Sequence, residues 1–439
     1  MISKPAPALD VRRFIDDRPV GRYQLLVASL CGVVVAIDGF DAQVMGYVAP
    51  VLSRELHIAR VALGSVISSG TVGMMVGALV FGPLADRIGR KPILVACTLT
   101  FGVGSLLTAT ADTVAQLTVF RVLTGFGLGG AMPNAIALTS EYMPKRSRDT
   151  AVMTMFSGFA FGSAVAGWVS AATIGTFGWQ SVFIVGGSIP IVVAIILISW
   201  LPESVRFLVV SGGQESRLAE YLSRIAPGVS PAREPLIAEE EPRRFSIGEL
   251  FAGARRRGTL LLWTLFFMNL LDLWFLNNWL PTILNDAGIA TGTASLIASL
   301  FQVGGVIGSL VLAFALGGRL SFGGLAVIYG AAAVFIVLIG QSRTFTPLLP
   351  IAISVSGMCV IGGQTASNAL AADFYPTAIR ATGVGWALGI GRIGSILGPV
   401  LGGVLLSYGG SAKHIFWAAA IPPLIAAAAA AAVHLPAKE

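Results

Sequence analysis

Two acidic residues, Asp38 and Asp41, lie inside an apolar stretch that runs from Leu25 to Val51 and is long enough to cross a bilayer. At about 1.5 Å per residue, Asp38 lies roughly 20 Å into this stretch, near the middle of the hydrocarbon. An ionised carboxylate there costs on the order of 2.5 to 3.5 kcal/mol, so we expect it beside a wet cavity or a cation. The i, i+3 spacing puts both carboxylates on one helix face. The pair predicts a functional site; the alternative is polar contact that only joins helices.

Arg121 is a candidate partner for these acids. It lies about nine residues past Asp112, hence roughly 14 Å along its helix and within about 5 Å of the depth of Asp38 and Asp41. Two carboxylates near one guanidinium are not both comfortably ionised, so our hypothesis is that one of them carries a proton. The alternative is a permanent structural salt bridge.

A second arginine, Arg392, also lies near the middle of an apolar stretch. A guanidinium offers two parallel N–H donors to a carboxylate, which a lysine does not. We therefore expect Arg392 to bind the carboxylate of a ligand. The alternative is that Arg392 pairs with Asp272, which lies at comparable depth in another stretch. Arg392 can also bind the ligand in one state of the protein and pair with Asp272 in another.

Aromatic and amide side chains in the same stretches are candidates for the walls of a central cavity. These residues are Phe40, Phe156, Phe159, Trp274 and Trp386, with Asn134, Asn277, Asn278, Gln302 and Gln364. The alternative for each aromatic residue is that it faces lipid or fills a packing gap.

The whole composition is that of an integral membrane protein. The 439 residues are 55% hydrophobic and only 12% charged, with a mean hydropathy of +0.81, whereas soluble domains are about 25% charged. Apolar windows fall at 24–50, 61–83, 92–110, 114–140, 149–173, 179–201, 258–284, 293–317, 322–341, 346–372, 381–407 and 412–435. These windows predict an all-α fold of twelve transmembrane helices.

The windows divide into a cytoplasmic N-terminal segment (1–23), a six-helix bundle (24–201), a linker (202–257) and a second six-helix bundle (258–435). Within the linker, Ser216 to Ile225 predicts a short surface helix with Leu218, Leu222 and Ile225 on one face. The three cysteines lie in apolar runs, so we expect no disulfide, metal site or cofactor.

The basic residues indicate the orientation in the membrane. With this helix order, 23 Lys and Arg residues lie on the side of the N-terminus and only four on the other side. Both termini are therefore predicted to be cytoplasmic. Because these residues are spread over the loops, the net charge of +7 does not indicate nucleic acid. The segment 1–23 has no pattern typical of a removable signal peptide.

The two halves of the chain repeat each other at a shift of 232 positions. The stretch Glu141-Tyr-Met-Pro144 matches Asp373-Phe-Tyr-Pro376 in this register, as do two pairs of glycines, Gly73 with Gly305 and Gly125 with Gly357. A parallel repeat of two bundles predicts a site at the midplane between them and rocking of one half against the other.

The loop Gly82-Pro-Leu-Ala-Asp-Arg-Ile-Gly-Arg-Lys91 resembles the signature of the major facilitator superfamily, and Pro202-Glu-Ser-Val-Arg206 resembles a second motif of that superfamily. The stretch Asp38 to Asp41, the region Arg121 to Arg148, and Trp279-Leu-Pro-Thr282 resemble the bacterial aromatic acid:proton symporters. This resemblance implies the pseudo-symmetric major facilitator fold and a substrate such as hydroxybenzoate or protocatechuate.

Charged residues at the cytoplasmic loops are candidates for a gate that closes in one state and opens in the other. They are Asp86, Arg87, Arg90, Glu141 and Arg148, with Asp373 and Arg380 in the second half. The second copy of the signature loop has Gly318 where the first has Asp86, so we expect any charge relay there to be one-sided.

We therefore expect a carrier that moves an aromatic carboxylate with protons into the cytoplasm across a bacterial inner membrane, and we expect a monomer. Moving an anion inward against an inside-negative potential costs about 2.3 kcal/mol per 100 mV, and a co-transported proton cancels that charge. The alternative is a proton-coupled exporter of drugs or of another organic acid. The sequence has no nucleophile elbow, P-loop or metal-ligand spacing, so an enzyme is not expected.

Overall fold

The computed structural model describes residues 9–211, 215–225, 235–236, 247–252, 255–315, 321–342, 347–376, 379–409 and 411–433. Within these ranges, twelve helices are long and apolar enough to cross a membrane, which confirms the predicted number. The first six are α2 (Arg22–Glu55), α3 (Arg60–Ile88), α4 (Arg90–Thr108), α5 (Val114–Tyr142), α6 (Lys145–Phe177) and α7 (Gln180–Trp200). The second set is α10 (Arg255–Asp286), α11 (Thr291–Ala315), α12 (Phe322–Gln341), α13 (Leu348–Phe374), α14 (Arg380–Ser407), and α15 (Ala412–Ala419) continued by α16 (Ile421–Ala432).

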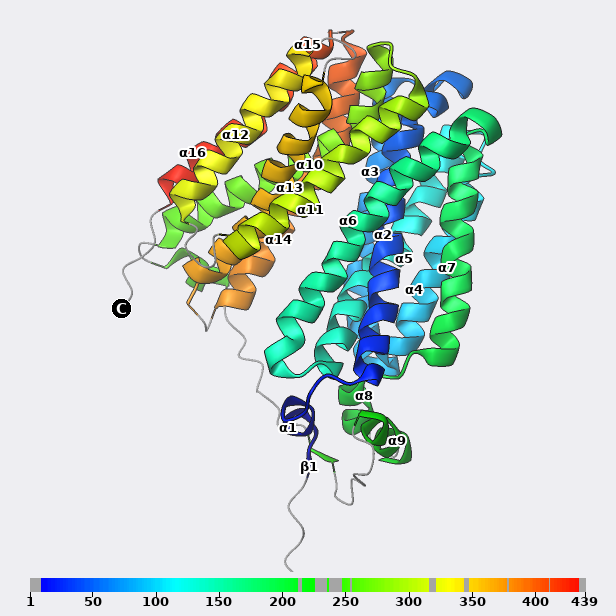
Figure 1. Ribbon diagram of the computed structural model, residues 1–439, viewed down its shortest axis with the longest axis vertical. Coiled ribbons are helices and arrows are strands. Elements are labelled where there is room, and N and C mark those ends of the chain that lie inside the picture. Colours follow the sequence, from blue (N-terminus) through cyan, green and yellow to red (C-terminus); the bar gives the residue numbers. More distant parts are fainter. Residues whose placement is uncertain are drawn as a thin grey trace, which may run out of the picture.

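The helices form two bundles, one from α2 to α7 and one from α10 to α16 (Figure 1). The shift of 232 positions also relates helices of the two bundles. Adding 232 to the first residue of α7, Gln180, gives the first residue of α15, Ala412, and adding 232 to the last residue of α7, Trp200, gives the last residue of α16, Ala432. The last span is interrupted at Ala420, where Pro422 and Pro423 open α16, because proline suits the first turn of a helix but not its interior.

Glycines set how closely the helices of each bundle pack. A Cβ atom on Gly125 would clash with the carbonyl oxygen of Gly70, so α5 lies directly against the backbone of α3. In the second bundle, Gly357 of α13 meets the carbonyl oxygen of Phe301 of α11 in the same way. The equivalent helix pairs therefore use the same close approach, which only residues without a side chain allow.

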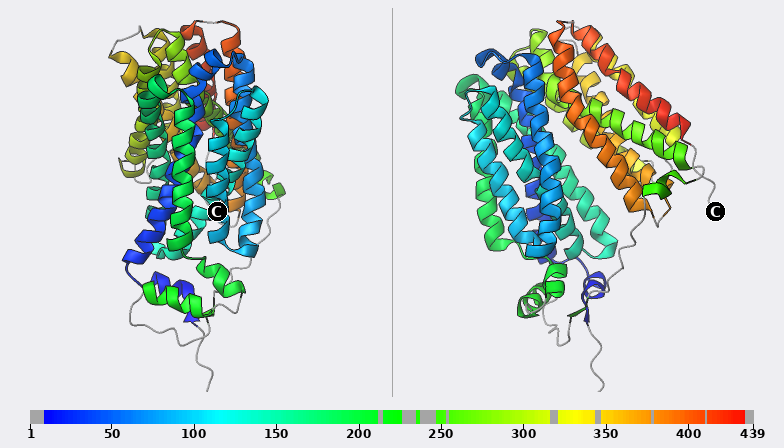
Figure 2. Two further views of the ribbon diagram at one scale, coloured as in Figure 1. Left: turned by 90° about the vertical axis from the view of Figure 1, so that its right-hand side faces the viewer. Right: turned by 180° about the vertical axis from the view of Figure 1, so that it is seen from behind.

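The two bundles contact each other through α2 and α10, α3 and α14, and α6 and α11. We call the end of the molecule that carries α8 (Val205–Ser211) and α9 (Glu215–Ile225) the linker side, and the opposite end the distal side. The bundles are close together at the distal side and splay apart toward the linker side (Figures 1 and 2). The Ser68 hydroxyl donates to the Ile396 carbonyl oxygen at 2.6 Å, joining α3 to α14.

Short elements lie on the linker side of the first bundle, below α2 (Figure 1). They include α1 (Val11–Asp16) and the two-residue parallel strands β1 (Leu9–Asp10) and β2 (Pro235–Leu236), while a 3-10 helix (Ile247–Phe251) precedes α10. The predicted surface helix is confirmed as α9. Its residues Leu218, Leu222 and Ile225 are buried against the core of the first bundle.

Candidate functional site

Arg121 and Asp41 form a two-pronged ion pair in the interior of the molecule. Arg121 Nη1 lies 3.1 Å from Asp41 Oδ1, and Arg121 Nη2 lies 3.0 Å from Asp41 Oδ2. Both side chains are buried, at 6% and 1% exposure. The hypothesis that Arg121 pairs with both acids of the first span is therefore wrong in this structure. Residues three apart on a helix point about 60° away from each other, so Asp38 faces another neighbour.

Asp38 and Arg392 line a cavity of about 490 Å³ between the two bundles. Asp38 is buried, and one of its carboxylate oxygens has no hydrogen-bond partner in the described part of the chain. Arg392 lies deep in the molecule but is accessible from the cavity, where it is close enough to Asp38 for their charges to interact. Arg392 Nη1 also lies 3.4 Å from Met74 Sδ of α3. The cavity thus contains a cation opposite an acid.

Amide side chains from both bundles add hydrogen-bonding groups to the cavity wall, namely Gln43, Asn277, Gln364 and Asn368. The Gln364 amide donates to Asn368 Oδ1 at 3.1 Å, and Gln364 Oε1 accepts from Asn269 at 2.5 Å. Gln43 and Asn368 are wall residues that the sequence analysis missed. The sequence offered one signal for them: Gln43 lies two residues after Asp41, and Asn368 lies about one helical turn after Gln364, so both are close to predicted site residues.

Asp272 does not meet Arg392 in this structure. It is 1% exposed, is absent from the cavity wall, and neither carboxylate oxygen has a hydrogen-bond partner among the described residues. The predicted alternative of an Arg392 and Asp272 pair is therefore not observed. The shift of 232 positions aligns Asp272 with Phe40, which is likewise buried and does not line the cavity.

The aromatic candidates separate into two groups. Phe159 and Trp274 line the cavity as predicted. Phe40 is buried against Gly186 of α7 instead, and Trp386 is 39% exposed and stacks on Trp263 with ring centroids 5.9 Å apart. The prediction that Phe40 and Trp386 line the cavity is therefore wrong in this structure. Phe40 fills a packing gap and Trp386 is partly exposed outside the cavity, as the alternative in the sequence analysis stated.

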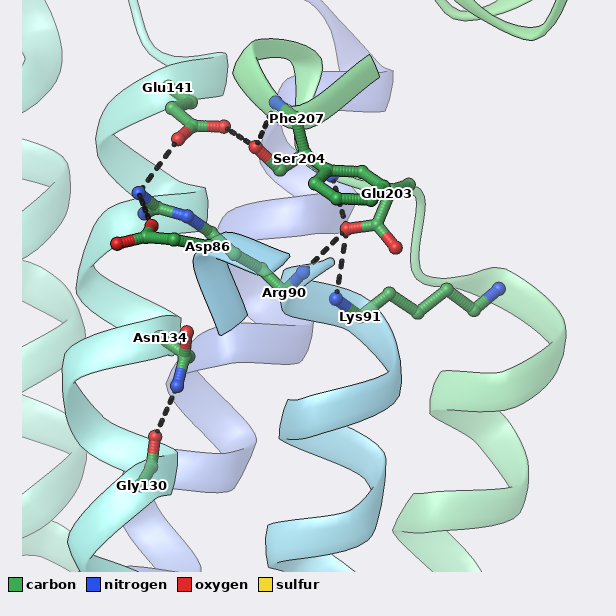
Figure 3. A network of polar contacts seen from close by, with 9 residues as sticks. All are labelled: Asp86, Arg90, Lys91, Gly130, Asn134, Glu141, Glu203, Ser204 and Phe207. Carbon is green, nitrogen blue, oxygen red and sulfur yellow. Dashed lines mark hydrogen bonds and ion pairs between the residues drawn. The ribbon is translucent and has the colours of Figure 1, made fainter. Parts of the chain in front are cut away.

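The remaining candidates, three amide residues and Phe156, neither line the cavity nor form one cluster. The Gln302 amide donates to Asn277 Oδ1 at 2.8 Å, in a separate small pocket with Gln43. Asn278 borders a void of about 20 Å³ together with Arg121 and Trp274. Phe156 is 41% exposed and does not line the cavity. The Asn134 amide donates to the carbonyl oxygen of Gly130 on its own helix at 2.7 Å, as Figure 3 shows.

The predicted gate residues Asp86, Arg90 and Glu141 form a network on the linker side (Figure 3). Arg90 Nη2 lies 3.3 Å from Glu141 Oε1 and 3.9 Å from Asp86 Oδ1. The Ser204 hydroxyl donates to Glu141 Oε2 at 2.6 Å. Glu203 Oε1 accepts three backbone N–H bonds, from Arg90 at 2.8 Å, Lys91 at 3.1 Å and Ser204 at 2.8 Å.

This network ties together the linker-side ends of α3, α4 and α5 and the residues after α7, all within the first bundle. The sequence analysis noted the motif that contains Glu203 and Ser204 but assigned neither residue a role. A carboxylate that holds the first N–H groups of a helix also opposes the helix dipole favourably. The network therefore fixes the start of α4.

The other gate candidates lie outside this network. Arg148 Nη2 lies 3.5 Å from Asp16 Oδ1 of α1, a partner that the sequence did not indicate. Arg87, Asp373 and Arg380 are exposed at the linker side. Gly318, in the second copy of the signature loop, lies outside the described residues.

The sequence matches the family profile of the Major Facilitator Superfamily over residues 31–282 and 262–439. This chain is a member of the major facilitator superfamily. The expected family and fold are thereby confirmed, and the protein is a multi-pass membrane transporter rather than an enzyme.

Relatives in this superfamily cover nearly the whole transporter. This chain is 43% identical to the 4-hydroxybenzoate transporter PcaK of Pseudomonas putida, over 95% of this chain and 94% of that protein. It is 40% identical to the gallate transporter of Pseudomonas putida, over 97% of this chain and 95% of that protein. The resemblance to carriers of aromatic acids, inferred from the motifs, is confirmed by these relatives.

Solved structures of superfamily members share the fold of this transporter. A bacterial homologue of the human lysosomal transporter Spinster, in an inward-facing and occupied conformation, gives a TM-score of 0.73 at 17% identity, covering 94% of this chain and 97% of that one. The nucleoside transporter NupG gives a TM-score of 0.71 at 15% identity, covering 94% and 99%.

Proposed function

We propose that this transporter carries a small hydroxylated aromatic carboxylate together with protons across a bacterial inner membrane, into the cytoplasm, as a monomer. The names of its relatives support the substrate class, because they include transporters of 4-hydroxybenzoate, gallate and 3-(3-hydroxy-phenyl)propionate. The cavity supports it too: about 490 Å³ lies within the usual range of roughly 300 to 1,000 Å³ for small-ligand sites.

The observation that carries the proposal is that Arg392 and Asp38 line the same cavity. A substrate carboxylate that binds Arg392 through two N–H donors competes with Asp38 for that cation. Once its cation is engaged elsewhere, the Asp38 carboxylate is stabilised by taking up a proton. Substrate binding and proton binding thus become one linked event.

The Asp41 and Arg121 pair supplies a second candidate proton site beside the cavity. Arg121 borders the small void next to Trp274, and Trp274 also lines the cavity. Its charges are compensated at rest, so it costs little to keep in the membrane. Together the two pairs provide two carboxylates for coupling, and two protons per substrate would let the membrane potential assist uptake.

The charge distribution supports the orientation. Within the described residues, the basic side chains are concentrated on the linker side, so we propose that the linker side and both termini are cytoplasmic. The structure is then open toward the cytoplasm and closed at the distal side. The bundles 24–201 and 258–435 rock about the contacts of α2 with α10, α3 with α14, and α6 with α11. The network around Arg90 moves with the first bundle as one body.

Uptake into liposomes that contain the purified transporter tests this function. Labelled 4-hydroxybenzoate should accumulate when the exterior is more acidic than the interior, and much less when a protonophore removes the gradient. Labelled 4-hydroxybenzylamine, a cation with the same hydroxylated ring, is the matched control and should not accumulate. Uptake that is indifferent to the gradient would contradict proton coupling, whereas accumulation only under the reverse gradient would indicate an exporter.

A further inference from the structure

A groove of about 600 Å³ lies on the linker side of the first bundle, away from the central cavity. Its wall includes the end of α3, the first turns of α4, the end of α7, α8 and α9. In Figure 1, α4 and α7 lie on the face of the first bundle that is turned away from the second bundle. The groove is therefore separate from the proposed transport pathway.

Two cations and an apolar wall meet in this groove. Lys91 and Arg217 are its basic residues, and its apolar residues are Ile88, Pro92, Val95, Ala96, Leu99, Ile198 and Phe207. From Lys91 to Leu99 the helix advances about 12 Å toward the centre of the membrane. The groove thus presents positive charge at its mouth and apolar surface along its depth.

The Lys91 ammonium group forms no ion pair within the network around Arg90, although it is near enough to Glu203 for their charges to interact. Lys91 gives its backbone N–H to Glu203, but its side chain extends away from that carboxylate, toward the end of α7 (Figure 3). Among the described residues, its ammonium group makes no hydrogen bond or ion pair. Glu203 is the carboxylate of the groove, and three backbone N–H groups already bind it.

The groove lies at the level where a membrane surface meets these helices. Lys91 is in the first turn of α4, and Trp200, at the end of α7, is 63% exposed. Exposed tryptophan at the end of a span is typical of the headgroup region. Ile88 and Ile198, at 50% and 54% exposure, open the groove sideways toward the bilayer.

We propose that this groove binds an anionic phospholipid of the linker-side leaflet. Its phosphate lies between the Lys91 ammonium and the Arg217 guanidinium, and one acyl chain follows Val95, Leu99 and Ile198. Basic pockets between membrane helices select anionic headgroups in this way. The bound lipid links the start of α4 to α9 and stabilises the linker-side end of the first bundle.

The test measures lipid binding to the purified full-length transporter by native mass spectrometry and by thermal unfolding. Dioleoylphosphatidylglycerol should bind and raise Tm, while dioleoylphosphatidylcholine, which has the same chains and no net charge, should do neither. Lys91→Gln and Arg217→Gln should each weaken binding about fivefold, as expected for one cation at a membrane surface. Lys91→Arg should retain binding, which shows that the charge is responsible and that the protein remains folded.

Arg224→Gln is the matched control, because it removes one cation from the same helix at a residue that pairs with Glu220 and does not line the groove. It should bind phosphatidylglycerol as the wild type does. Equal binding of the two lipids would overturn the proposal, and so would unchanged binding in the Lys91→Gln, Arg217→Gln double variant. Displacement of the lipid by inorganic phosphate or by 4-hydroxybenzoate, with the same dependence on Lys91, would instead assign the groove to a soluble anion and would also overturn it.

Discussion

Arg60 Nη2, at the start of α3, lies 2.9 Å from Asp286 Oδ1, at the end of α10, on the distal side. The pair joins the two bundles where they are closest, and Arg54 Nη2 donates to Thr291 Oγ1 nearby at 3.2 Å. An ion pair that spans two moving bodies has to break when they separate. We therefore expect this pair to favour the state that is closed at the distal side.

Arg60→Ala should shift the equilibrium toward distal opening by up to about fivefold, because partly exposed ion pairs contribute about 0.2 to 1 kcal/mol. A cysteine at position 299, which lies against Gly167 at the bundle contact, reports this opening through its labelling by a membrane-impermeant maleimide. The three native cysteines are first replaced by alanine. The exchanged pair Arg60→Asp with Asp286→Arg should restore the slow labelling. Identical labelling rates in the wild type, the Arg60→Ala variant and the exchanged pair would show that the Arg60 and Asp286 ion pair does not favour the state closed at the distal side.

Asp41→Asn should abolish gradient-driven accumulation of substrate while exchange of substrate across the membrane persists. The amide keeps the shape of the side chain but cannot carry a proton between the two sides. It also leaves Arg121 buried without a counter-charge, and breaking a buried pair costs about 3 to 5 kcal/mol. We therefore expect a lower Tm as well. The double variant with Arg121→Gln should recover stability but not accumulation, which separates coupling from folding. Wild-type accumulation by Asp41→Asn would refute the assignment.

Arg392→Gln should weaken substrate binding about 10- to 100-fold, because hydrogen bonds to charged groups contribute about 1.5 to 3 kcal/mol. Arg392→Lys keeps the charge but loses the paired donors, so its affinity for the substrate should lie between that of the wild type and that of Arg392→Gln. Isothermal titration of 4-hydroxybenzoate measures both. Lys413→Gln removes a cation at the distal end and is the control. If Arg392→Gln binds as tightly as the wild type, Arg392 does not hold the carboxylate.

Glu203→Ala should lower the thermal stability substantially, because it leaves the backbone N–H groups of Arg90, Lys91 and Ser204 without their acceptor. A buried donor left unsatisfied costs about 1 to 3 kcal/mol. Glu203→Gln retains an oxygen in the same place and should therefore lower the Tm less than Glu203→Ala does. Thermal unfolding in detergent compares these variants with Glu220→Ala, an exposed carboxylate of α9. A Tm for Glu203→Ala equal to that of Glu220→Ala would show that the network does not stabilise the bundle.

The sequence by itself determined the number of spans, the register of the repeat and the family. Span length and apolar content are local properties, so the twelve windows correspond to helices whose ends differ from the predictions by only a few residues. The repeat is equally visible, because a shift of 232 positions aligns loops and glycines before any contact is known. The short helix α9 was predictable for the same reason, since its apolar residues recur with the helical period.

Only the tertiary structure decided which polar and aromatic side chains meet. Spanning helices are apolar on every side, so their sequence does not tell a face that lines a cavity from one that packs against a neighbour. Asp38 and Asp41 looked alike, yet one binds Arg121 and the other faces the cavity with Arg392. Asp272 is buried away from the cavity wall for the same reason. Contacts between helices depend on rotation about each helix axis, and packing between distant segments sets that rotation.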